Sequence, residues 1–130
     1  GVSWGGYAGL SVRLSSTTSD WEALNSNGEQ DLDANQKRAD WLQYTFDLPG
    51  EKSGGITVFD HPDNRRHPTP WYVIMDEQVP FGYFSPALLY YDPLTLEKNE
   101  RLSLKYRIIV QESALPQDEL QKRWRSFAGE

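Results

Sequence analysis

The chain has 130 residues, no cysteine and a formal net charge of −6 at pH 7. This length suits one domain with a single hydrophobic core, and the share of charged residues, 25%, is typical of a folded globular protein. The excess of carboxylates argues against nucleic acid or an anionic membrane as partner, because both attract clustered Lys and Arg. Without cysteine there is no disulfide, thiolate nucleophile or thiolate metal site, and no cofactor is predicted.

The first half of the chain predicts short strands separated by polar turns. Leu10, Val12 and Leu14 alternate with polar residues, which is the period-2 pattern of a half-buried strand. Further strands are predicted over residues 21–24, 39–47 and 56–59. Both faces of 39–47 carry aromatic residues, so we expect that strand to be covered on both sides. Residues 29–37 show no periodicity and predict an exposed loop.

The second half predicts strands over 71–76, 87–91 and 102–110, with an aromatic loop over 80–86. Residues 116–127 predict the single helix, because a proline and two acidic residues precede its basic residues and so complement the helix dipole. An apolar stripe at helical spacing should dock this helix on a sheet; it consists of Leu120, Trp124 and Phe127.

Short strands divided by Gly, Pro and Asn turns, with one C-terminal helix, predict an all-β fold, an antiparallel β-sandwich, rather than βαβ units. Residues 1–130 are expected to form one domain, and because the chain opens on Gly rather than Met we expect it to be a processed or excised piece of a longer chain. Half of a sandwich would expose sheet edges and apolar faces. Self-association, or pairing with missing N-terminal strands, is therefore a candidate interaction.

The densest group of titratable residues lies in the segment from Asp60 to Trp71, which reads DHPDNRRHPTPW. It contains both histidines of the chain, His61 and His67, and three prolines that fix the backbone. A rigid loop crowded with titratable groups is the usual way to hold a site on a sandwich scaffold. This loop is the leading candidate for the functional site.

Three interpretations of the loop remain open. In a catalytic one, His61 or His67 acts as a general acid or base oriented by Asp60 or Asp63, while Arg66 stabilises developing negative charge. In a metal-binding one, both histidines and one aspartate hold a divalent ion, although their spacing matches no well-known metal signature. In a structural one, the polar side chains satisfy loop backbone groups that lack partners in a β-ladder.

Aromatic residues offer a second candidate surface, a stacking platform for sugar rings. The candidates are Trp41, Tyr44, Trp71, Phe81, Tyr83 and Phe84. Packing within the core is the alternative for each of them. Tyr83 and Phe84, which lie in the predicted loop over 80–86, are the better candidates for an exposed surface.

Residues 55–71, GITVFDHPDNRRHPTPW, resemble the pattern G-(I/V)-(A/T)-(I/V)-F-D-H-P-x-N-x-R-H-P-T-P-W of the PmoA-like family of uncharacterised bacterial proteins, also labelled methane oxygenases. Trp41 and Tyr44 are similar to that family's W-x-x-Y segment, and residues 102–110 to its L-x-L-x-Y-R-(I/V)-x-V strand. Arg65 departs from the pattern where Pro is common, and Gln43 where Asp is frequent. The resemblance covers nearly the whole chain.

The resemblance implies the C-terminal half of a longer sandwich of the galactose-mutarotase type, from a secreted or periplasmic parent. The compartment of this chain is otherwise unknown. The oxygenase label implies a membrane subunit, and no apolar run here approaches the roughly 20 residues of a membrane span. The site positions that the resemblance implies are Asp60, His61, Asn64, Arg66, His67 and Trp71.

The leading hypothesis is a carbohydrate-active or carbohydrate-binding sandwich, with a carbohydrate or another small molecule as partner. His61 and His67 would be the acid/base or ligand-binding groups, and Asp60 and Arg66 would complete the catalytic set. The residues expected to contact substrate are Asn64, Trp71, Trp41, Tyr44 and Tyr83. The alternative is a non-catalytic structural or interaction domain in which the loop is a rigid brace.

Overall fold

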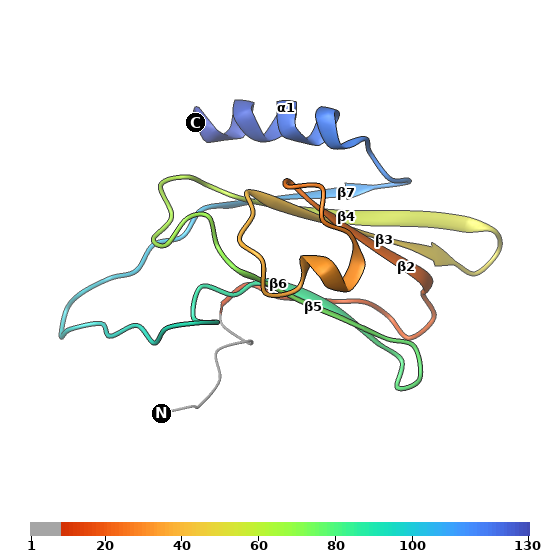
Figure 1. Ribbon diagram of the computed structural model, residues 1–130, viewed down its shortest axis with the longest axis horizontal. Helices are drawn as coiled ribbons and strands as arrows, with labels where there is room; N and C mark the ends of the chain where they lie inside the picture. Colours follow the sequence, from red (N-terminus) through yellow and green to blue (C-terminus); the bar gives the residue numbers. More distant parts are fainter. Residues whose placement is uncertain (1–8) are drawn as a thin grey trace.

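The computed structural model describes residues 9–130, which form two antiparallel sheets and one long helix (Figure 1). The three-stranded sheet has the order β1 (Val12–Arg13), β6 (Phe81–Pro86), β5 (Trp71–Asp76). The four-stranded sheet has the order β2 (Ser19–Asn25), β3 (Trp41–Leu48), β4 (Lys52–Asp60), β7 (Tyr106–Gln111). The 3₁₀-helix η1 (Asp31–Ala34) and helix α1 (Gln117–Ala128) complete the fold. The predicted all-β sandwich with a C-terminal helix is confirmed.

The main core lies between the two sheets. Residues opposite each other in an antiparallel ladder share a face, so the pairs Leu42–Val58 and Tyr44–Ile56 turn one side of the four-stranded sheet toward its partner sheet. There the ring of Tyr44 stacks on that of Phe84, with centroids 5.3 Å apart. Burial of these large rings stabilises the sandwich.

A second, outer core lies between the four-stranded sheet and α1, which covers it in Figure 1. Trp41 and Phe59 form an opposing pair on this face and pack against Leu120 and Phe127 of the helix. The expectation that the strand over 39–47 is covered on both faces is therefore confirmed. The prediction of a C-terminal helix that docks on a sheet is also confirmed. The helix begins just after Pro116 and carries acidic residues in its first turn.

Two adjacent predictions are wrong. Residues 81–86 are strand β6 rather than an aromatic loop, because they pair along their whole length with β5. Residues 87–91 form turns rather than a strand, because Ala87 donates to the Pro70 carbonyl and Tyr90 to that of Ala87. Pro86 at one end and Pro93 at the other limit ladder formation between them.

Other predicted boundaries shift because the extent of pairing, rather than the apolar run, sets where a strand begins. β4 begins at Lys52, so only a tight turn separates it from β3. β7 begins at Tyr106 and is an edge strand, and Ile108 and Val110 on its inner side are 50% and 79% exposed. Residues 29–37 are not simply an exposed loop, because they contain η1 and the fully buried Ala34. Within residues 9–130, no helix is long and apolar enough to cross a membrane.

Replacing Leu120 by Ala tests whether α1 belongs to the cooperative core. Leu120 is 0% exposed, so Leu120→Ala should lower the free energy of unfolding by about 2–5 kcal/mol through lost burial and a residual cavity. Urea denaturation followed by tryptophan fluorescence measures this change. Lys122→Ala, on the exposed side of the same helix, is the control and should leave stability nearly unchanged. Equal effects of the two changes would show that the helix is not docked in solution.

Candidate functional site

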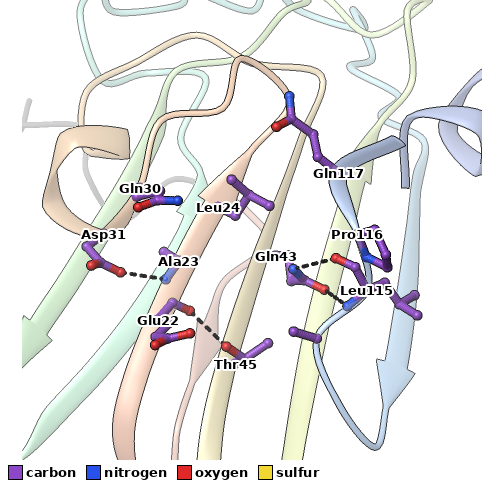
Figure 2. Close-up of a pocket in the computed structure, with 11 residues that line it drawn as sticks. Glu22, Ala23, Leu24, Gln30, Asp31, Gln43, Thr45, Leu115, Pro116 and Gln117 are labelled. Atoms are coloured by element: carbon purple, nitrogen blue, oxygen red, sulfur yellow. Dashed lines mark hydrogen bonds between the residues drawn. The ribbon is translucent and has the colours of Figure 1, made fainter. Parts of the chain in front are cut away.

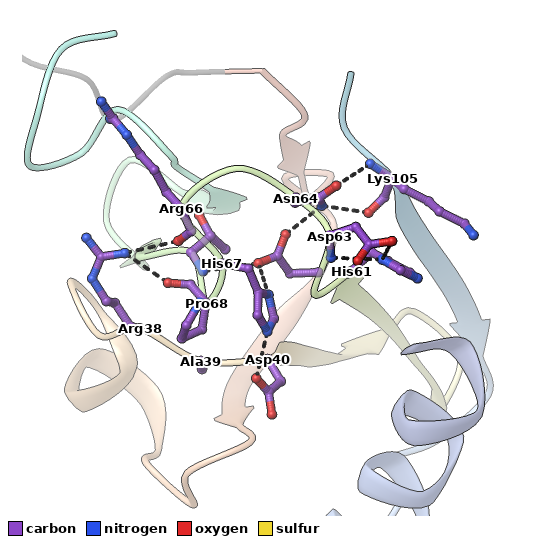
Figure 3. A network of polar contacts seen from close by, with 12 residues as sticks. Arg38, Ala39, Asp40, His61, Asp63, Asn64, Arg66, His67, Pro68 and Lys105 are labelled. Atoms are coloured by element: carbon purple, nitrogen blue, oxygen red, sulfur yellow. Dashed lines mark hydrogen bonds and ion pairs between the residues drawn. The ribbon is translucent and has the colours of Figure 1, made fainter. Parts of the chain in front are cut away.

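The loop between β4 and β5 carries the chain from one sheet to the other (Figure 3). Asp60 is the last residue of β4, and Trp71 is the first of β5. Arg66 adopts a left-handed backbone conformation with φ of 67°, and the His67–Pro68 peptide bond is cis. The loop folds back on the end of β4, so its polar side chains converge on Asp60.

Asp60 is the centre of this network and is only 1% exposed. Its Oδ1 accepts a hydrogen bond from Asn64 Nδ2 at 2.8 Å, and its Oδ2 accepts one from the Thr69 backbone N–H at 3.1 Å. Oδ2 also lies 2.7 Å from His67 Nδ1. Burial raises the pKa of this carboxyl, and the bonds from Asn64, His67 and Thr69 oppose that rise. Both carboxylate oxygens are thus occupied within the protein.

His67 connects the loop to two further parts of the fold. Its Nε2 lies 3.2 Å from Asp40 Oδ1, so each ring nitrogen faces a carboxylate oxygen. The ring can donate both hydrogen bonds only when it carries both protons. It also stacks on Trp124 of α1, whose indole Nε1 donates to the Asp60 carbonyl at 2.9 Å. His67 is 12% exposed and Asp40 is 30% exposed, so this pair reaches the surface.

His61 lies on the inner side of the loop and is only 2% exposed. Its Nδ1 accepts the backbone N–H of Asp63 at 3.1 Å, so the neutral ring carries its proton on Nε2. The ring meets Phe127 edge-on at a centroid distance of 5.0 Å. Nε2 is buried and has no hydrogen-bond partner in the part of the chain that the structure describes. His61 therefore packs against the helix and presents no nitrogen to solvent.

Asn64 and Arg66 hold segments that lie far along the chain. Asn64 Nδ2 donates to the Lys105 carbonyl at 2.7 Å, and its Oδ1 accepts the Lys105 N–H at 2.6 Å, which fixes the residues before β7. The guanidinium of Arg66 donates to the carbonyls of Leu88, Asp92 and Pro93. The turn segment 87–93, which neither sheet holds, is therefore fastened to the loop.

The sequence-predicted aromatic platform is mostly core. Trp41, Tyr44 and Trp71 are 0% exposed, and each donates a hydrogen bond from its ring nitrogen or hydroxyl within the protein. The expectation that Tyr83 and Phe84 are exposed is wrong, since they are 4% and 0% exposed. The cause is the pairing of β6 with β5, which makes 81–86 a central strand and turns Phe84 into the core.

Three partly exposed tyrosines were missed by reasoning from sequence. Tyr72 of β5, Tyr90 and Tyr91 lie in a row, with centroids 5.7 Å apart for the first pair and 5.2 Å for the second. Tyr91 is 52% exposed. The available signal was the Tyr-Tyr doublet directly before Asp92-Pro93, in a proline-bounded segment that was assigned to a strand.

A hollow of about 280 Å³ lies elsewhere, between β2, β3 and the residues leading into α1 (Figure 2). Gln43 forms part of its wall, and both polar atoms of its amide bond the Leu115 backbone, at 2.8 and 3.2 Å. Glu22 and Asp31 also line it, whereas no Lys or Arg does. No residue of the 60–71 segment lines it, so the hollow and the loop are separate features. Among residues 9–130, no three His, Asp or Glu side chains gather as a metal site would require.

A family model matches residues 3–125, which is nearly the whole chain. The chain belongs to the DUF6807 family. This is a family of unknown function, so membership assigns no activity to the loop. No curated protein and no solved structure matches the chain. Function must therefore be argued from the geometry of this DUF6807 domain itself.

The raised pKa of Asp60 gives stability a definite pH dependence. Between the ordinary Asp pKa and the raised value, the folded state keeps the proton that the unfolded state has lost, so the free energy of unfolding falls as pH rises through that interval. Asp60→Asn has no titrating carboxyl at this position and lacks this pH dependence. Urea denaturation of both proteins from about pH 3 to about pH 6 should show the stability of the wild type, relative to the variant, declining with pH. The opposite slope would mean that hydrogen bonding to the charged carboxylate outweighs its desolvation.

Proposed function

We propose that this DUF6807 domain is a non-catalytic binding module and that the loop Asp60 to Trp71 is its structural brace. The main support for the proposal is that the polar groups of the loop form hydrogen bonds within the protein. Both oxygens of Asp60, both polar atoms of the Asn64 amide and two nitrogens of Arg66 bond other parts of the same chain. Buried polar groups arranged in this way fix the positions of the segments that they join.

The segments that the loop joins are ones that lack other anchors. Asn64 holds the residues before the edge strand β7, and Arg66 holds the turns after β6. His67 links Asp40, just before β3, to Trp124 of the helix. Each of these segments has few ladder hydrogen bonds of its own, so side-chain bonds from the loop take their place.

A catalytic role for the loop makes different demands. A general acid or base must come within hydrogen-bond reach of a substrate atom, about 2.6–3.2 Å, without leaving a buried partner unsatisfied. His61 is enclosed by the loop and the helix, and the Arg66 donors are taken by backbone carbonyls. These contacts support the brace over the four-residue catalytic set His61, His67, Asp60 and Arg66.

A second candidate function is favoured by the His67–Asp40 pair. Asp60 orients His67 through Nδ1, as a carboxylate orients a catalytic imidazole, and Nε2 faces the partly exposed Asp40. In this arrangement His67 is the acid or base of a carbohydrate-active domain. The kinship with PmoA-like proteins and with sandwiches of the galactose-mutarotase type is likewise a proposal, resting on the DHPDNRRHPTPW motif and its flanking segments.

His67→Ala separates the two candidate functions. If the loop is a brace, the variant loses its contacts to Asp60, Asp40 and Trp124, and its melting temperature should fall by several degrees. Differential scanning calorimetry measures this. A variant that melts like the wild type but no longer turns over a mono- or disaccharide substrate would support the catalytic candidate instead.

The two adjacent arginines provide a matched test of the brace. Arg66→Met removes the donors to three carbonyls and should lower the free energy of unfolding by about 1–3 kcal/mol, because the segment 87–93 loses its fastening. Arg65→Met is the control, since Arg65 is half-exposed and, among the described residues, has only a 3.9 Å ion pair with Glu100. Its effect should stay below about 0.5 kcal/mol in the same urea titration. Equal losses for the two variants would refute the brace.

A further inference from the structure

The three partly exposed tyrosines form a continuous aromatic surface at one edge of the sandwich. Tyr72 comes from the edge strand β5, while Tyr90 and Tyr91 come from the turns after β6. The ring planes are inclined by 39° between Tyr72 and Tyr90 and by 62° between Tyr90 and Tyr91. Tyr91 is its most exposed member at 52%, and the guanidinium of Arg38 lies 5.8 Å from the centroid of its ring.

These rings are held in place before any ligand arrives. Gln36 Nε2 donates to the Tyr90 hydroxyl at 2.9 Å, and the Tyr91 hydroxyl donates to the Gln36 carbonyl. The brace fastens the same segment through Arg66, which bonds the carbonyls on either side of the two tyrosines. Rings fixed in this way lose little conformational entropy on binding, which favours affinity.

A shallow groove of about 570 Å³ adjoins Tyr72 and follows the outer edge of β5, beyond the point where residues 35–37 bond its backbone, toward the turn into β6. Its apolar lining includes Leu32, which is 58% exposed, and Ile74. Its polar lining consists of Asn35, Asp76, Glu77 and Gln78. Asn35 Oδ1 accepts the Val73 N–H, and Asp76 Oδ1 accepts those of Gln78 and Val79. The second oxygen of Asp76, the Glu77 carboxylate and the Gln78 amide oxygen supply further acceptors, and among the described residues no Lys or Arg lines the groove.

We propose that this groove and the tyrosine surface together bind a neutral oligosaccharide. A pyranose ring has an apolar C–H face, which packs on the electron-rich face of an aromatic ring, and a rim of hydroxyls that donate to carboxylates and amides. Tyr72 belongs to both features, so the hydrogen-bonding groups of the groove adjoin the aromatic rings of the tyrosine surface. Its acidic lining repels anionic sugars and phosphates.

Affinity gel electrophoresis tests the proposal with four soluble neutral polysaccharides: galactomannan, xyloglucan, arabinoxylan and mixed-linkage β-glucan. Wild-type protein should be retarded in at least one of these gels. Tyr91→Ala and Glu77→Ala should each weaken the retardation, the first by about tenfold, because an aromatic contact is lost. Tyr91→Phe keeps the ring and should bind within about twofold of wild type. Val110→Ala, exposed on the distant β7, is the matched control and should bind like wild type.

Three outcomes would overturn the proposal: no retardation in any neutral gel, retardation that survives Tyr91→Ala, or stronger retardation in polygalacturonate than in the neutral gels. The proposal rests on the binding-module function, and the two fail differently. If Arg66→Met destabilises the domain and Arg65→Met does not, the brace stands even when no gel retards the protein. If the arginine pair shows no contrast while Tyr91→Ala abolishes retardation, the sugar site stands without the brace.

Discussion

The carboxylate of Asp60, buried at the end of β4, is the interaction on which the rest of this domain depends. A charged carboxylate out of water is strongly unfavourable unless hydrogen bonds replace its hydration. Asn64, His67 and the Thr69 N–H supply those bonds, and Trp124 bonds the carbonyl of the same residue. The composition of the loop follows from this need, because each donor must lie within a few residues of Asp60 yet reach back toward it.

The consequences extend well beyond the loop. Once Asn64 and His67 are fixed on Asp60, Arg66 between them has a defined backbone and reaches the carbonyls of 88–93. Those turns then carry Tyr90 and Tyr91 to the edge of β5 beside Tyr72. The buried Asp60 carboxylate thus fixes Arg66, and Arg66 in turn fixes the turns that carry Tyr90 and Tyr91. Loss of Asp60 contacts is expected to loosen the tyrosine segment before it unfolds either sheet.

Local pattern was enough to predict some elements and not others. The helix was predictable because its initial proline, its charge order and its apolar stripe all lie within one short segment. Strand β5 was predictable because its apolar run coincides with the residues that pair. β6 was missed because Gly and Pro in the segment 80–86 suggest a loop, and only pairing with β5 makes it a strand. The loop itself was found from residue types. Its role was not, since whether a histidine is free or bonded depends on partners such as Asp40 and Trp124, which lie elsewhere in the sequence.

A structural brace and a binding surface differ in how many of their polar atoms remain free to bond a ligand. A polar side chain recognises a ligand only with atoms that the fold has left unbonded, and the loop between Asp60 and Trp71 leaves few of them. A tyrosine whose hydroxyl is bonded internally can still contact a ligand with its ring. Tyr91 is 52% exposed while its hydroxyl bonds the Gln36 carbonyl, and the guanidinium of Arg38 lies 5.8 Å from the centroid of its ring. An anchored ring is a better recognition element than a free one, because the entropy of fixing it is already lost in folding. For this DUF6807 domain we therefore propose that the titratable groups of the loop hold the structure in place, and that the tyrosine rings beside them form the binding surface.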